Sequence, residues 1–407
     1  MGKNMRKTAP ALPVDEVVLE VKAALASRGR AVLKADPGAG KTTRVPLSLV
    51  NEPWLKGKKI LMLEPRRLAA RACAHYMAAS LDEPVGRTIG YRIRMEERSG
   101  KNTRILIITE GILTRMIQSD PALEGVGLVI FDEFHERHIH SDLGLALCLE
   151  SSEVLRPDLK ILVMSATMDV KAVSRILDNG PVVQSGGRAF PVSTSYVPPP
   201  AMAQADPARR YSPVLEACAR AVRAALEKDV GDILVFLPGQ AEIRRMEVLL
   251  SHLKGKNLDL VPLFGNLSLK DQARAIKPSG PGRRKIVLST AIAETSLTIE
   301  GIRVVVDSGL MRVSRFSSGT GMSRLETVAV SKASADQRRG RAGRTSPGTC
   351  YRVWSPHVHQ GLVPFSRPEI MSKDLCSLVL ELALWGVKDP CELKWLDPPP
   401  PSGVNQA

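Results

Sequence analysis

The sequence has few aromatic residues and few cysteines, and it has no long apolar run. Phe, Trp and Tyr make up 4% of its 407 residues, which argues against broad stacking of nucleic-acid bases as the main mode of binding. The six cysteines include no C-x-x-C pair, so they indicate buried, reduced thiols and neither a disulfide framework nor a zinc site. They are Cys73, Cys148, Cys218, Cys350, Cys376 and Cys391.

The sequence also lacks the signals of export and membrane insertion. The basic start, MGKNMRKTAP, has no apolar segment behind it, and no stretch reaches about 18 uninterrupted apolar residues. We therefore expect no signal peptide and no membrane span. Together with the reduced thiols this predicts a cytoplasmic protein, which we expect to be monomeric.

Positive charge is the strongest compositional signal. The 57 Lys and Arg residues outnumber the 42 Asp and Glu residues, giving a net charge of +15. Such an excess favours a polyanionic partner, either nucleic acid or an anionic membrane surface, although it could also serve solubility alone.

Short β-rich runs alternate with amphipathic stretches in both halves of the chain, which is typical of an α/β fold with parallel sheets covered by helices. The strands predicted in the first half are Arg30–Ala35, Lys59–Leu63, Arg104–Ile108, Gly127–Phe131 and Lys160–Met164, with helices over Arg67–Leu81 and Gly111–Ile117. Those predicted in the second half are Asp232–Leu237, Asp259–Leu263, Lys285–Leu288, Ile302–Val306 and Thr349–Trp354.

Composition divides the chain into five segments. We expect residues 1–13 to form a disordered basic N-terminus and residues 14–192 to form a first α/β domain. Pro191–Arg210 is rich in Pro, Ala and Ser and predicts an exposed linker, bounded at 193–212, before a second domain at 213–360. In that domain a Ser-Gly-Thr-Gly turn predicts a protruding β-hairpin between Gly309 and Val330. Residues 361–407 predict an amphipathic helix over Lys373–Trp385 and a proline-rich tail.

A glycine-rich loop lies between the first predicted strand and a helix, in the sequence ADPGAGKTT at 35–43. The context is that of a P-loop, whose backbone N–H groups bind phosphate oxygens, although the strict pattern has Gly where Ala35 stands. Lys41 would reach the β- and γ-phosphates, and the Thr42 hydroxyl would ligate Mg²⁺. The candidate phosphate-binding residues are Pro37, Gly38, Ala39, Gly40, Lys41, Thr42 and Thr43.

Two adjacent acids follow the apolar strand in VGLVIFDEFH at 126–135. The carboxyl end of a strand is where α/β sheets place ligand chemistry. Asp132 would hold Mg²⁺ through water, and Glu133 would orient and deprotonate an attacking water. The run from His135 to His140 invites a zinc interpretation, but its spacing does not fit H-E-x-x-H and no further ligands cluster nearby. We expect His135 to couple to the catalytic acids.

Seven motifs occur in a fixed order along the chain. After the P-loop come EPRR at 64–67, TEGILTRMI at 109–117, DEFH at 132–135 and SAT at 165–167, then STAIAETSLTI at 289–299 and QRRGRAGR at 337–344. In that order they resemble the motifs of superfamily 2 DExH helicases of the DEAH/RHA group. The resemblance implies two tandem RecA-like domains followed by the start of a winged-helix domain in 361–407, so we expect a C-terminally truncated architecture.

The resemblance also implies roles for individual residues. Arg341 and Arg344 would be arginine fingers on the γ-phosphate, with a nucleic-acid patch or solvated face as the alternative for this basic run. Gln337 would lie near the attacking water, and Ser165 and Thr167 would link nucleotide state to domain closure. The residues that would contact nucleic acid are Arg66, Arg67, Thr109, Thr290, Thr295 and Ser296.

The adenine site departs from the family pattern. Phe316 matches the aromatic residue that stacks on adenine, but Tyr76 stands where the family usually has arginine. Tyr76 either stacks on the base or is a packed helix residue, so nucleotides other than ATP are also candidate substrates.

These features favour an ATP- and Mg²⁺-dependent helicase on single-stranded nucleic acid, RNA in preference to DNA. The alternatives are a nucleic-acid-stimulated NTPase that clamps RNA–protein complexes without unwinding, a non-catalytic binding scaffold, and a P-loop kinase. Five intact residues argue against a scaffold: Lys41, Asp132, Glu133, Arg341 and Arg344. A kinase would not need the second half.

Overall fold

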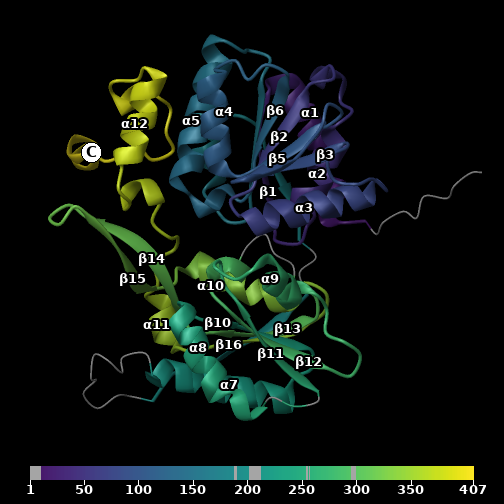
Figure 1. The fold of residues 1–407 in the computed structure, drawn as a ribbon, viewed down its shortest axis with the longest axis vertical. Coiled ribbons are helices and arrows are strands. Elements are labelled where there is room, and N and C mark those ends of the chain that lie inside the picture. The colour runs from purple at the N-terminus through teal and green to yellow at the C-terminus, as the bar shows by residue number, and fades with distance from the viewer. Residues whose placement is uncertain (1–10, 188–189, 201–211, 254, 256, 295–298) are drawn as a thin grey trace, which may run out of the picture. The chain divides into compact units, whose positions relative to one another are not determined.

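The computed structural model describes residues 11–187, 190–200, 212–253, 255, 257–294 and 299–407 (Figure 1). It consists of two compact units, each built around its own sheet. The first unit comprises Met1–His135, His140–Arg188 and Cys391–Leu396, and the second comprises Glu136–Ile139, Ala189–Pro390 and Asp397–Ala407. No helix in the described part of the chain combines the length and apolarity that a membrane span requires.

The first unit contains an eight-stranded sheet in the order β4-β3-β5-β2-β6-β7-β1-β8, parallel except for the β3–β4 pair. Its strands are β1 Arg30–Ala35, β2 Lys59–Leu63, β3 Ile89–Ile93, β4 Glu96–Arg98, β5 Ile105–Ile108, β6 Val126–Phe131, β7 Lys160–Ser165 and β8 Val182–Ser185. Its helices are α1 Val18–Arg28, α2 Lys41–Leu49, α3 Arg67–Ser80, α4 Glu110–Ser119, α5 Ile139–Val154 and α6 Val170–Ile176.

Helices cover both faces of this sheet, which explains why its inner strands β5 and β6 are buried along their whole length. Leu25 of α1, Val45 of α2 and Met77 of α3 share one core with strand residues such as Leu33 and Ile130. Helices α4 and α5 lie on the other side (Figure 1). Every residue of β6 is buried, as expected for a central strand of a parallel sheet. β6, β7 and β1 are adjacent in that order in the sheet. The DEFH, SAT and P-loop motifs, which follow these three strands, therefore meet at the carboxyl edge of the sheet.

The second unit contains a six-stranded parallel sheet in the order β11-β12-β10-β13-β16-β9, and a separate antiparallel hairpin, β14-β15. The strands are β9 Val192–Tyr196, β10 Asp232–Phe236, β11 Leu258–Leu263, β12 Arg284–Ser289, β13 Ile302–Asp307, β14 Leu310–Ser317, β15 Met322–Ala329 and β16 Gly348–Arg352. The helices are α7 Ser212–Lys228, α8 Gln240–Leu249, α9 Leu269–Ile276, α10 Lys332–Gly340, α11 Pro356–Gln360, α12 Cys376–Trp385 and α13 Pro401–Gln406.

Alternate residues of β10 face two different cores. Ile233 and Val235 pack with α7 and α8, whereas Leu234 and Phe236 pack on the opposite face with Ala275 of α9. Figure 1 shows α7 and α8 on one side of this sheet and α9 and α10 on the other. The predicted β-hairpin between Gly309 and Val330 is confirmed, with eight residue pairs in register from Leu310–Ala329 to Ser317–Met322.

The predicted linker at 193–212 is wrong over its first residues. Val192–Tyr196 forms β9, which pairs in parallel with β16 at the edge of the second sheet. Val192 and Thr194 are half-buried while Ser193 and Ser195 are exposed, so the alternation of an edge strand was present but hidden by Pro- and Ser-rich surroundings. The rest of the predicted linker includes residues 201–211, which lie outside the described residues.

The predicted disorder of residues 1–13 is wrong at its end. Residues 1–10 lie outside the described part, but Pro13–Glu16 forms a 3₁₀ helix that begins inside the predicted segment. Val14 is fully buried, and its N–H donates to the Ala39 carbonyl at 3.1 Å. Apolar residues at the end of the basic segment therefore order it against the glycine-rich loop.

Two further expectations need correction. Cys376 and Cys391 are exposed, whereas the other four cysteines are buried as predicted. The helix predicted from Lys373 begins at Cys376, because Asp374 accepts the Cys376 N–H at 2.9 Å and ends the preceding segment. That 361–407 begins a winged-helix domain stays a prediction.

Candidate active site

The loop between β1 and α2 has the backbone conformation of an anion-binding turn. Gly38 and Gly40 adopt φ values of 88° and 94°, in the left-handed region that favours glycine. The Gly40 carbonyl accepts N–H groups from Thr43 at 3.2 Å and Arg44 at 2.8 Å, which starts α2 directly after the loop. The loop therefore ends at a helix N-terminus, where N–H groups and the helix dipole favour phosphate.

The acidic pair lies in a tight turn after β6. The Asp132 N–H donates to the Leu63 carbonyl of β2 at 3.2 Å, which continues the sheet pairing to the end of the strand. Glu133 has φ = 50°, an uncommon conformation for a side chain-bearing residue, and its N–H donates to Asp132 Oδ1 at 2.8 Å. Phe134 packs edge-on against Phe131 with ring centroids 6.1 Å apart, which fixes the turn to the core.

The structure brings the loop and the acidic pair together. Lys41 Nζ lies 2.8 Å from Glu133 Oε1 and 3.9 Å from Asp132 Oδ1. The Thr42 hydroxyl donates to Asp132 Oδ2 at 2.5 Å. These residues come from two segments about ninety positions apart, and strand order alone makes them neighbours. The arrangement combines a cation for phosphates, two hard oxygen ligands for a divalent metal, and a second carboxylate.

Burial shifts the protonation of this cluster. It raises the pKa of Asp132 to about 6, and the nearby Glu133 charge adds to the shift while Lys41 and the Thr42 hydroxyl oppose it. Burial lowers the pKa of Lys41, but the charges of Glu133 and Asp132 outweigh burial, and the net pKa is raised. Lys41 is therefore charged at neutral pH. Because the folded pKa of Asp132 is raised, its ionisation costs stability as pH increases towards about 6, a cost that a bound cation would offset.

A divalent cation fits the donors present. The Thr42 hydroxyl and the Asp132 carboxylate are oxygen ligands of the kind Mg²⁺ prefers, with phosphate and water completing the shell. Among the described residues no group of three or more His, Cys, Asp or Glu side chains is arranged to hold a metal by itself. His135 is nearly buried, with Nδ1 3.5 Å from Glu133 Oε2, so it contacts the acid to which the sequence couples it.

Cys73 makes a contact that was not predicted from the sequence. Pro46 lies inside α2 and has no N–H to donate to the carbonyl of Thr42, four residues earlier. The Cys73 thiol of α3 donates to that carbonyl at 3.7 Å. Burial raises the pKa of Cys73 well above its usual value, with the charges of Glu64 and Asp132 adding, so the thiol stays protonated as this contact requires. A proline four residues after a P-loop threonine was the available signal.

The other predicted residues of the first unit follow neighbouring strands. Arg66 and Thr109 follow β2 and β5, which are adjacent, so both lie at the carboxyl edge of the sheet; Arg67, the first residue of α3, is exposed. Ser165 ends β7 and is fully buried, with no hydrogen bond to its hydroxyl within the described residues. Thr167, two residues later, is half-buried.

Tyr76 is not a packed helix residue. Its side chain on α3 is 61% exposed, which removes that alternative and leaves the ring accessible for stacking. Phe316 lies on β14 of the second unit, half-buried, and its N–H donates to the Ser372 carbonyl at 3.0 Å.

The basic motif of the second unit forms the end of α10 and the turn after it. Gln337 and Arg341 are buried, and Arg344 is half-buried. Arg341 donates through Nη2 to the main-chain carbonyl of Glu294. Thr290 follows β12 and precedes the 3₁₀ turn Ala291–Ala293. Thr295 and Ser296 lie outside the described residues.

Arg338 was not among the predicted site residues, although it is the largest fully buried side chain in the described chain. Its guanidinium forms ion pairs with Glu294 and Asp307, each at 2.9 Å. The QRRGRAGR motif contains four arginines, of which Arg341 and Arg344 were assigned a role and Arg338 was not. Only the fold shows that the Arg338 side chain is fully buried and pairs with two carboxylates.

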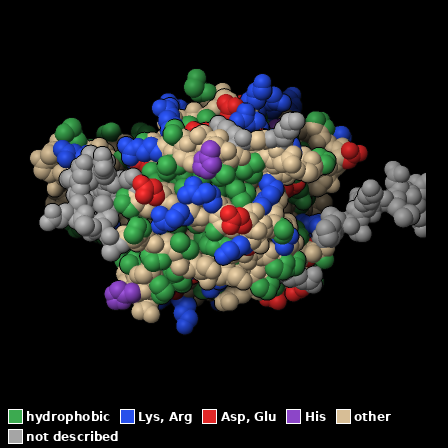
Figure 2. Space-filling model, turned by 90° about the horizontal axis from the view of Figure 1, so that it is seen from below, with side chains coloured by type: hydrophobic (Ala, Val, Ile, Leu, Met, Phe, Trp, Pro, Cys, Tyr) green, Lys and Arg blue, Asp and Glu red, His purple; other side chains and the backbone are tan. Residues whose placement is uncertain are grey.

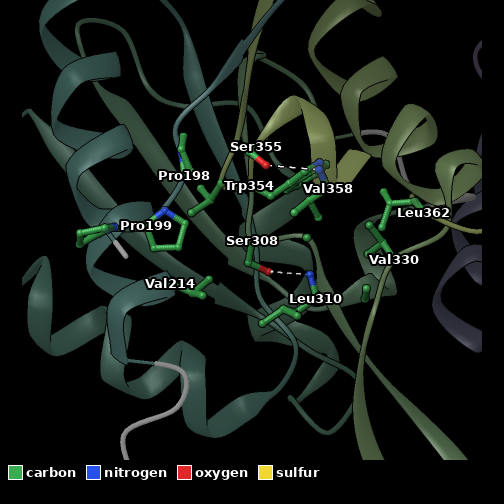
Figure 3. Close-up of a pocket in the computed structure, with 14 residues that line it drawn as sticks. Pro198, Pro199, Val214, Ser308, Leu310, Val330, Trp354, Ser355, Val358 and Leu362 are labelled. Carbon is green, nitrogen blue, oxygen red and sulfur yellow. Dashed lines mark hydrogen bonds between the residues drawn. The ribbon is translucent and has the colours of Figure 1, made fainter. Parts of the chain in front are cut away.

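A cavity of about 480 Å³ lies at the base of the β14–β15 hairpin, as Figure 3 shows. Its lining is mainly apolar, with Leu310, Val330 and Trp354 among its residues, and none of the predicted site residues contributes to it. The predicted nucleotide-binding residues therefore do not belong to this cavity.

Replacing Gly40 with alanine should damage the loop. A Cβ at this position would lie 2.7 Å from Leu12 Cδ1, and the φ of 94° is strained for any side chain. We expect the free energy of unfolding to fall by about 1–3 kcal/mol or more, with loss of nucleotide binding. Thermal unfolding and nucleotide titration would measure both. Gly111→Ala in α4, which meets nothing within 4 Å, is the control, and a Gly40→Ala protein that unfolds and binds like wild type would refute this view of the loop.

Comparison with known proteins places these motifs in a family context. Residues 18–176 match the family described as "DEAD/DEAH box helicase". Residues 215–346 match the family described as "Helicase conserved C-terminal domain". The chain is 48% identical over 389 residues to the ATP-dependent RNA helicase HrpB of Escherichia coli, covering 96% of this chain and 47% of that protein. It is 36% identical to the human probable ATP-dependent RNA helicase DHX34, covering all of this chain and 36% of the relative.

A solved structure has the same fold as this chain. The crystal structure of the E. coli DEAH/RHA helicase HrpB superimposes with a TM-score of 0.89 at 47% identity, covering 97% of this chain and 49% of that one. The chain thus spans about half the length of this relative, or less for the human one.

Proposed function

Because the chain belongs to the DEAD/DEAH box helicase family and its two sheet units are RecA-like domains, we propose that it hydrolyses ATP to translocate on, or remodel, single-stranded RNA. RNA is preferred to DNA because both named relatives are described as RNA helicases. Mg²⁺ is the proposed metal.

The observation that carries the proposal is the Lys41–Thr42–Asp132–Glu133 cluster. It combines, within direct contact, a charged lysine, two oxygen ligands for a cation and a carboxylate able to accept a proton. Mg²⁺, held by Thr42 and Asp132, would neutralise phosphate charge when bound. Lys41 binds the β- and γ-phosphates, and Glu133 orients a water and accepts its proton. His135 beside Glu133 Oε2 steadies that carboxylate.

Residues of the second unit complete the proposed chemistry. Arg341 and Arg344 supply positive charge as the γ-phosphoryl group transfers, and Gln337 orients the water. Phe316 and Tyr76 stack on the base; an aromatic pair of this kind tolerates other bases than adenine. Ser165 and Thr167 link nucleotide state to closure.

A second candidate is a nucleic-acid-stimulated NTPase that clamps RNA without separating strands. The Lys41–Thr42–Asp132–Glu133 cluster supports this candidate equally well, because its contacts serve ATP hydrolysis and none of them requires strand separation. A strand-displacement assay run beside an ATPase assay separates the two. Displacement that requires ATP supports the motor, turnover without displacement supports the clamp, and no turnover refutes both.

RNA binding should depend steeply on salt if Arg66, Arg67 and Thr109 contact the backbone. The log–log slope on single strands is about −0.7 per phosphate neutralised. We expect Arg67→Ala to weaken RNA binding and to make this slope less negative by about 0.7. Fluorescence titration of poly-pyrimidine RNA at several salt concentrations measures the slope.

Arg28→Ala is the matched control, because Arg28 is also exposed but precedes β1, at the opposite edge of the same sheet. It should leave the slope unchanged. Equal slopes for Arg67→Ala and wild type would remove Arg67 from the RNA-binding surface.

The excess of basic residues does not form a separate patch on every face of the protein. On the face drawn in Figure 2, Lys and Arg side chains are interspersed with Asp and Glu. We therefore assign RNA binding to the motif residues and not to this face. Cytoplasmic localisation and a monomeric state stay predictions from the sequence.

A further inference from the structure

Arg338 is held by three different segments of the second unit. Its Nε donates to Glu294 Oε2 and its Nη1 to Asp307 Oδ1, both at 2.9 Å. Nη1 also donates to the Leu310 carbonyl at 3.2 Å, and the guanidinium carbon lies 4.9 Å from the Phe236 ring centroid. The side chain is 1% exposed, so protein atoms enclose it almost completely. Burial lowers the pKa of Arg338, but the two carboxylates outweigh it, which keeps the side chain charged.

Glu294 has contacts at both its side chain and its main chain. The carboxylate binds Arg338, while the carbonyl of the same residue accepts a hydrogen bond from Arg341 Nη2. Glu294 directly follows the turn that begins at Thr290. One residue thus joins the segment after β12 to two arginines of the same basic motif.

Asp307 and Leu310 extend the network to the root of the hairpin. Asp307 Oδ1 accepts the Gly309 N–H at 2.9 Å as well as the Arg338 contact. The Ser308 hydroxyl accepts the Leu310 N–H, a bond drawn in Figure 3. The turn that starts β14 is therefore fixed by Arg338 from one side and by its own hydrogen bonds from the other.

We propose that Arg338 is a positioning residue that sets the orientation of Arg341 by tying it, through Glu294, to the segment after β12 and to the hairpin root. The proposal rests on the proposed function, in which Arg341 acts in ATP hydrolysis. The Arg338 donors bind protein acceptors, so in this proposal Arg338 acts on hydrolysis only through Arg341. A planar fork is needed to reach Glu294 and Asp307 at once, so lysine cannot replace it.

A double-mutant cycle tests this dependence. Arg338→Lys should lower kcat by about 10–100-fold, as expected for a misplaced catalytic group, with the KM for ATP little changed. In an Arg341→Lys background, whose kcat is already low, Arg338→Lys should cause almost no further loss, because the group it positions is gone. Phosphate release in single-turnover conditions would give all four rates.

Two further variants separate positioning from folding. Glu294→Gln keeps an acceptor for Arg338 and should retain more activity than Glu294→Leu, while thermal unfolding reports any loss of fold. Arg352→Lys is the control: Arg352 is also buried and pairs with Asp336 of α10 at 2.8 Å, and its replacement should leave kcat near wild type.

The outcomes are distinct. Non-additive losses at Arg338 and Arg341 with unchanged unfolding support the proposal. Multiplicative losses, or losses that follow the unfolding temperature across all variants including Arg352→Lys, overturn it while leaving the proposed function intact. A folded wild type without any ATP hydrolysis refutes the proposed function, and this proposal with it.

Discussion

Glu133→Gln is expected to reduce ATP turnover by about 10²–10⁴-fold, the usual cost of losing a general base. Glutamine keeps the shape of the side chain and can still accept a hydrogen bond from Lys41 Nζ, which lies 2.8 Å from Glu133 Oε1. It cannot take a proton from water. ATP binding should therefore survive while kcat falls. Nucleotide titration and steady-state phosphate release, measured on the same variant, would show that the chemical step is lost and not binding.

The control for this variant is Glu96→Gln. Glu96 is a half-buried acid of the same unit, bound to Tyr91 and Arg71, and it lies on β4 at the far end of the sheet. Its replacement should leave turnover unchanged. Near wild-type hydrolysis by Glu133→Gln would remove Glu133 from the role of base and would leave the uncommon φ of 50° at this residue without a catalytic explanation.

Arg341→Ala and Arg344→Ala are each expected to lower kcat by about 10³–10⁵-fold, as for arginine fingers in related phosphoryl transfer. Nucleotide affinity should fall much less, because a finger stabilises charge that develops only in the transition state. Stopped-flow nucleotide binding and steady-state phosphate release together provide the two quantities.

Arg339→Ala is the matched control for both arginines. Arg339 belongs to the same motif, but its side chain is half-exposed and its Nε lies 3.7 Å from Asp336 Oδ1. It should turn over ATP normally. If Arg341→Ala or Arg344→Ala bound ATP far more weakly and yet had a normal kcat at saturation, that arginine would be a binding residue. Unfolding measurements are needed for Arg341, since it is buried and contacts Glu294.

Much of the fold follows from the local pattern. β2 occurs at the predicted bounds because a strand buried on both faces is a continuous apolar run, here the four residues after Lys59. β1 also occurs at its predicted bounds, although Lys34 interrupts its apolar run. β9 was missed because an edge strand buries only one face, so VSTSY carries too little apolar signal among prolines. The order of the strands, which makes β6, β7 and β1 neighbours, came only from the structure.

The site was predictable where a motif states the chemistry, and not where the contact is long-range. Lys41 and Glu133 could be named from their motifs, but the left-handed turn that aims Glu133 could not. Arg338 and Asp307 lie 31 positions apart, and nothing in their local sequence distinguishes a buried ion pair from a solvated charge. Pro46 indicates that the Thr42 carbonyl lacks its usual helical donor, but the sequence does not show that Cys73 of another helix supplies one.

The most direct test of the central claim is ATP hydrolysis by the wild-type chain measured in parallel without nucleic acid, with single-stranded RNA and with single-stranded DNA, at low and at moderate salt. RNA that spans both domains should favour the arrangement competent for hydrolysis and so stimulate turnover. The account predicts stimulation by RNA that is largest at low salt, weaker with DNA, and absent in Glu133→Gln. Turnover that RNA does not change at either salt, from a protein shown to bind it, would contradict the account and would describe an uncoupled NTPase.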